Sequence, residues 1–139
     1  MGMSYLLDTN ILCESSKPRP NAGVVSWMRQ ASVGRLMLSV VTIGEIRRGV
    51  ERLRARNDHP QARRYEQWLA ETQDLYSERL IPVDIRVAET WGDIDAQHPL
   101  ATTDGLIAAT AKVHGLTVIT RNTKDFHTTG VRILNPFTS

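Results

Sequence analysis

Short apolar runs alternate with segments of helical periodicity along this chain, and no other feature constrains its fold as much. Each run is long enough for a strand, and three of them pass directly into polar residues and a helix-like pattern. Strands that alternate with helices form a mainly parallel sheet with helices on its faces. The pattern therefore predicts an α/β fold, a three-layer αβα sandwich around a central sheet of about five strands. The expected strands are residues 5–7, 36–41, 80–83, 116–120 and 131–134.

The length of 139 residues indicates one domain, residues 1–139. Two consecutive helical segments flank a break at residues 57–60 and predict a helical hairpin at about residues 43–76. Cys13 is the only cysteine, so no intrachain disulfide can form. The first residues lack the basic start and apolar run of a signal peptide, and no stretch approaches the ~20 apolar residues of a membrane span. We therefore expect a cytoplasmic protein without a membrane-spanning segment.

Four acidic residues stand at the exits of expected strands or at the starts of expected helices. They are Asp8, Glu45, Asp104 and Asp125. Asp8 has a structural explanation as a helix N-cap, and Glu45 has one as the partner of Thr42 in a capping box. The first turn of a helix suits the carboxylate of Asp104, and a turn suits Asp125. Taken singly, each residue therefore leaves the structural and the functional interpretation open.

A parallel sheet brings its strand exits to one edge, which favours a shared site for these carboxylates. Asp8 and Glu45 emerge from strands on the same side, and Asp125 lies in the loop that leaves another strand, whereas the position of Asp104 follows only from the fold. Carboxylates that lie close together raise one another's pKa unless a cation neutralises them. Oxygen ligands without histidine or cysteine indicate Mg²⁺ or Mn²⁺ rather than Zn²⁺. Such a metal lowers the pKa of a bound water and offsets an anionic transition state, so the expected chemistry is phosphodiester hydrolysis.

Five motifs occur in order over nearly the whole chain. They are Leu7-Asp8-Thr9-Asn10, residues 41–46 (VTIGEI), 103–111 (TDGLIAATA), 120–126 (TRNTKDF) and 130–136 (GVRILNP). In these motifs the sequence resembles the PIN-domain ribonucleases, and among them the VapC-like toxins of type II toxin–antitoxin modules. The resemblance implies a PIN-like fold and a Mg²⁺- or Mn²⁺-dependent endoribonuclease that a small antitoxin protein neutralises. It also implies a homodimer.

The resemblance assigns roles within the acidic quartet. Asp8 and Asp104 correspond to the family's firmest metal ligands, and Glu45 corresponds to a helper that binds metal or orients the attacking water. Asp125 is the fourth acidic position, and Asn122 is a candidate to share its work. Hydrogen bonds from three further polar side chains are expected to hold the carboxylates in place. These side chains belong to Thr9, Asn10 and Thr120.

Arginines are concentrated after residue 45, and some of them are candidate contacts for an RNA backbone. The alternative is a solvated helix face whose arginines pair with Glu51 and Glu66. The resemblance adds another use, because this helical region often carries the groove that holds the antitoxin peptide. The candidate RNA contacts are Arg47, Arg48, Arg52 and Arg121.

Two other functions compete with the nuclease. A non-catalytic PIN-like module would bind RNA or protein and use the carboxylates as helix caps, but the intact quartet argues against it. A phosphatase or receiver-type domain with an aspartyl-phosphate needs a lysine near the acidic site, and Lys124 is the only near candidate. Asn10 also stands where a phosphatase has its second acid.

Overall fold

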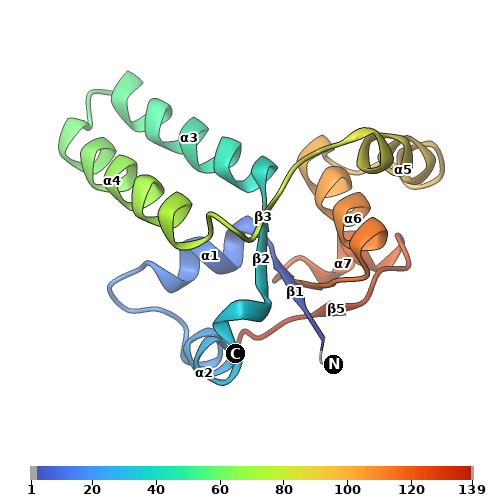
Figure 1. The fold of residues 1–139 in the computed structure, drawn as a ribbon. Helices are drawn as coiled ribbons and strands as arrows, with labels where there is room; N and C mark the ends of the chain where they lie inside the picture. The colour runs from blue at the N-terminus through green and yellow to red at the C-terminus, as the bar shows by residue number, and fades with distance from the viewer. Residues whose placement is uncertain (1–2, 139) are drawn as a thin grey trace.

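The computed structural model of the protein describes residues 3–138. Its strands are β1 (Tyr5–Leu7), β2 (Leu36–Ser39), β3 (Leu80–Ile81), β4 (Thr117–Ile119) and β5 (Ile133–Leu134). They form one sheet in the order β3-β2-β1-β4-β5, and every pairing between neighbours is parallel (Figure 1). In the register of this sheet, Leu6 lies between Met37 and Val118.

Helices cover both faces of the sheet. They are α1 (Thr9–Ser15), α2 (Ala22–Gln30), α3 (Val40–Ala55), α4 (His59–Leu75), α5 (Ile85–Gln97), α6 (Thr102–His114) and α7 (Thr123–His127), with a 3₁₀ turn η1 (Val33–Arg35) before β2. Leu7 and Ile119 pack in one buried cluster with residues of α1 to α4. Leu6 and Val118 point to the other face and pack with α5, α6 and α7, because successive strand residues alternate. The predicted three-layer αβα sandwich is therefore confirmed (Figure 1).

The junction between β2 and α3 differs from the prediction. The expected strand continued through Val41, but β2 ends at Ser39 and α3 starts at Val40. The Ser39 hydroxyl accepts a hydrogen bond from the backbone N–H of Val41 at 3.0 Å and so caps the helix. The expected capping box of Thr42 and Glu45 is therefore wrong, and the Glu45 carboxylate is left for another partner.

The helices α3 and α4 lie side by side and extend away from the sheet (Figure 1). Their short connection contains Asn57, whose φ of 63° lies in the left-handed region that asparagine tolerates. Asp58 then caps α4, since its Oδ1 accepts the backbone N–H of Gln61 at 3.4 Å, and Pro60 occupies the first turn. The polar residues and the proline of this break therefore start a helix, as their order in the sequence predicts.

The remaining elements are close to their expected positions. β3 is an edge strand that stops before Pro82, which has no N–H for a further ladder bond. β5 starts at Ile133, two residues later than expected. Asp125 lies in the short helix α7, whereas the sequence suggested a residue of a loop turn, so that structural explanation is wrong. Between residues 3 and 138, no helix combines the length and the apolarity that a membrane span needs.

Candidate active site

Asp8 is a buried carboxylate at the point where β1 ends and α1 begins. It is only 4% exposed, although its side chain is an ionisable carboxyl group. Its Oδ1 accepts the backbone N–H of Thr9 at 2.8 Å. Its Oδ2 accepts the Thr120 hydroxyl at 2.7 Å and the Asn10 amide at 3.2 Å. Burial, together with the nearby charge of Glu45, raises the pKa of Asp8 in spite of the hydrogen bonds from Thr120 and Thr9.

Glu45 points from the first turns of α3 toward α1. Its Oε1 accepts the Thr9 hydroxyl at 2.5 Å, and that hydroxyl oxygen lies 3.1 Å from Oγ1 of the buried Thr42. Its Oε2 makes no hydrogen bond within residues 3–138 and lies 3.9 Å from Nη2 of Arg48. Thr9 therefore connects Glu45 to Asp8, because its hydroxyl donates to Glu45 and its backbone N–H donates to Asp8. The sequence did not predict this contact of Thr42 with Thr9, because the position of Thr42 suggested a helix cap.

Asp104 and Asp125 come from the other face of the sheet and share one amide. The Nδ2 of Asn122 donates to Asp125 Oδ2 at 2.8 Å and to Asp104 Oδ2 at 3.4 Å. Asp104 is half-buried in the first turn of α6, as expected. Burial raises the pKa of Asp104 to about 6, and the negative charges of Asp8, Glu45 and Asp125 add to the effect. All four candidate carboxylates therefore lie close enough to interact.

Polar side chains after β4 connect the two halves of this cluster. The Thr120 hydroxyl donates to Asp8 and accepts the backbone N–H of Asn122 at 2.9 Å. Asn10 bonds to Asp8 through its amide and accepts the backbone N–H of Arg121 at 3.3 Å through Oδ1. The side chains expected to hold the carboxylates are thus all placed within hydrogen-bond distance of the cluster.

A hard divalent cation fits the chemistry of this site. Its ligands would be carboxylate oxygens, and their mutual repulsion is a cost that a cation removes. Among residues 3–138, no three acidic, histidine or cysteine side chains are grouped closely enough to hold one ion between them. An ion held here would therefore be bound by fewer than three of these side chains, with waters as its other ligands.

The arginines proposed for RNA contact occupy different surroundings. Arg47 is exposed on α3 but forms ion pairs with Glu51 and Glu66, as the structural alternative expected. Arg48 and Arg52 are exposed on another side of α3. The guanidinium of the exposed Arg121 lies over the Phe137 ring, 4.5 Å from the ring centroid.

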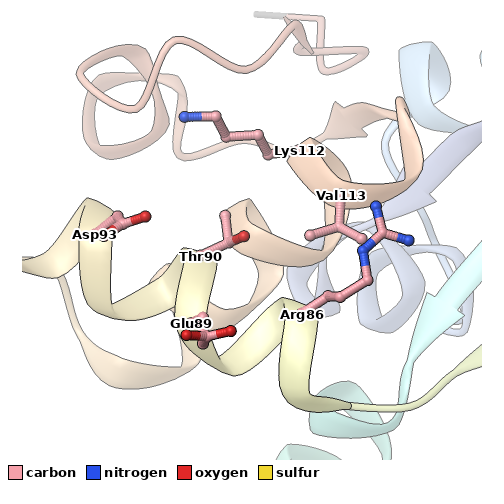
Figure 2. A pocket seen from close by; sticks show the side chains of 6 residues that line it. All are labelled: Arg86, Glu89, Thr90, Asp93, Lys112 and Val113. Carbon is pink, nitrogen blue, oxygen red and sulfur yellow. The ribbon is translucent and has the colours of Figure 1, made fainter.

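Two hollows deserve comparison with the carboxylate cluster. One is a mainly apolar groove of about 280 Å³ between α1, α3 and α4, and it reaches the cluster at Thr9 and Glu45. The other is an open hollow of about 410 Å³ on α5 and α6 (Figure 2). Residues of both charge signs line the second hollow, so its charge favours no class of ligand. They are Arg86, Glu89, Thr90, Asp93, Lys112 and Val113.

The sequence profile of the PIN domain matches residues 5–131. The chain belongs to the PIN-domain family. This PIN-domain protein is 36% identical over 138 residues to the toxin FitB of Neisseria gonorrhoeae, covering 95% of this chain and 97% of FitB. It is 31% identical over 141 residues to the VapC ribonuclease Y4jK of Sinorhizobium fredii, covering 95% and 96%.

A solved structure of FitAcB from Neisseria gonorrhoeae superposes on this PIN domain with a TM-score of 0.86. The identity is 35%, and the match covers 95% of this chain and 97% of the other. The predicted resemblance to PIN-domain proteins and VapC-like toxins is therefore confirmed.

Proposed function

We propose that this chain is a divalent-metal-dependent endoribonuclease and the toxin component of a toxin–antitoxin pair. The observation that carries the proposal is the grouping of four carboxylates, in which Thr9 bonds to both Asp8 and Glu45, and Asn122 bonds to both Asp104 and Asp125. Burial and the neighbouring carboxylates raise the pKa of Asp104 to about 6, in keeping with this grouping. A cluster that resists its own ionisation is one that a cation stabilises. The names of the relatives, the toxin FitB and a VapC ribonuclease, support the toxin role and the RNA substrate.

Asp8 and Asp104 are the residues that would hold Mg²⁺ or Mn²⁺. Such an ion, when bound, supplies a water of lowered pKa and positive charge for the phosphodiester transition state. Thr120 and Asn10 keep the Asp8 carboxylate in one orientation through their hydrogen bonds. Glu45 is oriented by Thr9, which leaves Glu45 Oε2 to bind the metal or to position the attacking water. Asp125 acts with Asn122 at the fourth position.

The test is cleavage of a labelled RNA in Mg²⁺, in Mn²⁺ and in EDTA. We expect cleavage with either metal and none in EDTA. The substitutions Asp8→Asn and Asp104→Asn keep the side-chain size but remove the charge, so they should abolish cleavage while circular dichroism shows an intact fold. A correctly folded Asp8→Asn protein that still cleaves RNA is incompatible with the proposal.

Calorimetric titration separates the nuclease from a non-catalytic PIN-like module. A nuclease of this kind should bind Mn²⁺ in the millimolar range or tighter, and Asp8→Asn should lose that binding. Absence of Mn²⁺ binding together with retained RNA binding would assign the chain to the module.

The proposed partner is a small antitoxin protein, and the proposed assembly is a homodimer in the cytoplasm. The groove between α1, α3 and α4 offers an apolar surface with Trp68 and Tyr65 on its wall, and it opens next to Glu45. A peptide in this groove would reach the carboxylate cluster. Co-purification with the product of an adjacent small reading frame, with loss of cleavage, tests the partner. Light scattering on the free protein tests the dimer.

A further inference from the structure

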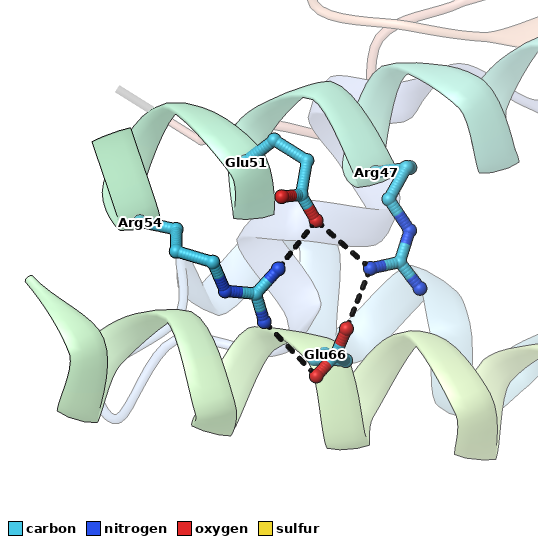
Figure 3. Close-up of polar contacts among 4 residues, drawn as sticks. All are labelled: Arg47, Glu51, Arg54 and Glu66. Carbon is cyan, nitrogen blue, oxygen red and sulfur yellow. Dashed lines mark hydrogen bonds and ion pairs between the residues drawn. The ribbon is translucent and has the colours of Figure 1, made fainter. Parts of the chain in front are cut away.

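Two sets of arginines on α3 have different surroundings. The first set is Arg47 and Arg54, which face α4 and share two glutamates (Figure 3). Glu51 Oε2 accepts Nη1 of Arg47 at 3.2 Å and Nη1 of Arg54 at 2.6 Å. Glu66 on α4 accepts Nη1 of Arg47 at 2.6 Å and Nη2 of Arg54 at 3.1 Å. These four side chains form a closed ring that joins the two helices, and their charges cancel within it.

The second set is Arg48 and Arg52, which share another side of α3, and Arg56, which follows the last residue of α3 at the same spacing of four. Arg56 also lines the groove between α1, α3 and α4. All three are exposed. Within residues 3–138, the guanidinium groups of Arg52 and Arg56 make no ion pair or hydrogen bond. Arg48 has one acidic neighbour, Glu45, at 3.9 Å. Among the described residues, Glu45 is therefore the only acidic partner of this second set, and most of its positive charge is not neutralised.

The position of this second set connects it to the carboxylate cluster. It starts beside Glu45 and continues along α3 to Arg56 for about 12 Å, at about 1.5 Å per residue. A cluster of four carboxylates repels a phosphate backbone, so a nuclease needs adjacent positive charge to bring RNA to the site. Exposed arginines that follow one side of a helix supply that charge, and guanidinium groups match phosphate geometry.

We propose that Arg48, Arg52 and Arg56 form a track for the phosphates of single-stranded RNA that leads to the carboxylate cluster, while Arg47 and Arg54 hold α3 against α4 without contacting RNA. The proposal rests on the nuclease function proposed above. An acidic peptide is the other ligand that such charges can bind. RNA is favoured because the track begins at the residues that would cleave it.

Two double substitutions on the same helix test the division, and each removes two positive charges. The track variant is Arg52→Gln with Arg56→Gln, and the ring variant is Arg47→Gln with Arg54→Gln. Binding of a fluorescent single-stranded RNA of mixed sequence is measured in EDTA over a range of KCl concentrations. The track variant should weaken binding about tenfold at 0.1 M salt and reduce the slope of log K against log salt by about 1.4, since each phosphate contact contributes about 0.7.

The ring variant should keep the RNA affinity and the salt slope of the wild type while its melting temperature falls. If the ring variant does not fold, Arg86→Gln with Lys112→Gln on α5 and α6 serves as the control, because it removes two charges on the other side of the sheet (Figure 2). Equal losses in the track and control variants would overturn the proposal, as would a track variant with unchanged RNA binding.

Two further measurements complete the test. A polyglutamate peptide of equal length is the acidic-peptide probe, and a track variant that loses this probe but keeps RNA would overturn the RNA assignment. Cleavage of the same RNA by the wild type in Mn²⁺ separates the two proposals. If the wild type cleaves the RNA and the track variant binds it as tightly as the wild type, the track is rejected and the nuclease is kept. If the wild type neither binds nor cleaves the RNA, the nuclease itself is rejected.

Discussion

Ionisation of Asp104 destabilises the folded chain. Its folded pKa of about 6 lies above the ordinary 3.8, so the folded state binds this proton more tightly than the unfolded state. Stability is therefore fully present below about pH 4, falls as the pH rises toward 6, and stays lower above that. A rise in the pKa from 3.8 to about 6 corresponds to a loss of about 3 kcal/mol in the free energy of unfolding. Solvent screening at this half-buried position reduces that loss to about 1–2 kcal/mol.

Asp104→Asn should therefore stabilise the metal-free protein by about 1–2 kcal/mol at pH 8 and have little effect near pH 4. Urea unfolding in EDTA at the two pH values measures the difference. The same gain at both pH values would show that the charge of Asp104 is not the cause.

Thr120 controls the orientation of Asp8 from the end of β4. Its side chain is fully buried, and its hydroxyl both donates to Asp8 and accepts the backbone N–H of Asn122. Thr120→Val has nearly the same shape but no hydroxyl, so we expect metal affinity or cleavage to fall about 10–100-fold. Thr120→Ser keeps the hydroxyl and is the matched control. Cleavage rates and Mn²⁺ titrations check the prediction, and equal rates for the two variants would contradict it.

At the level of elements, the pattern of apolar runs predicted the layers but not every boundary. Val40 and Val41 extend the apolar run after β2, and β-branched residues favour strands. The chain nevertheless enters α3 at Val40, because the Ser39 hydroxyl caps the helix. Likewise, Asp125 looked like a turn residue, but it lies in the short helix α7, where its carboxylate bonds to Asn122. At these two places, helix capping and tertiary contacts therefore determine the structure, and the local sequence propensity does not.

The contact between α5 and α6 depends on a glycine next to Asp104. A Cβ added at Gly105 would lie 2.9 Å from two atoms of the Trp91 indole, which is too close. Gly105→Ala should therefore push α5 from α6 and cost about 1–3 kcal/mol. Gly92 in the middle of α5 has no atom within 4 Å of the added Cβ, so Gly92→Ala should stabilise by about 0.5–1 kcal/mol. Chemical denaturation of the two variants measures these opposite signs, and destabilisation by both would refute the steric argument.

The fold of the whole molecule brings the four carboxylates of the site together from distant parts of the sequence. Asp8 and Thr120 are 112 residues apart in sequence and bond directly. The identities of the four carboxylates were available from the sequence, because each follows a strand or starts a helix. Their mutual distances were not, because these depend on the strand order, which places β1 between β2 and β4. No local pattern encodes that order. The ion pairs of Arg47 and Arg54 with two glutamates differ in this respect, because the sequence predicted both the helical hairpin and the pairing with Glu51 and Glu66.

Metal binding and the stability of the whole domain should be linked through this convergence. An ion that binds only the folded state stabilises it by about 2.7 kcal/mol at 100 times its dissociation constant. The wild type should gain this stability in Mn²⁺ at pH 8, and it should gain less near pH 5, where protonation of Asp104 competes with the metal. Asp104→Asn should gain little at either pH, because it has lost a charged ligand.

The order of stability of these two proteins should therefore reverse. In EDTA at pH 8 the Asp104→Asn protein should be the more stable, since it lacks the repulsion that raises the pKa of Asp104. In saturating Mn²⁺ at pH 8 the wild type should be the more stable. Thermal unfolding of both proteins under the two conditions measures the reversal. Equal responses to Mn²⁺ would mean that Asp104 does not bind the metal, even if the substitution still abolishes cleavage.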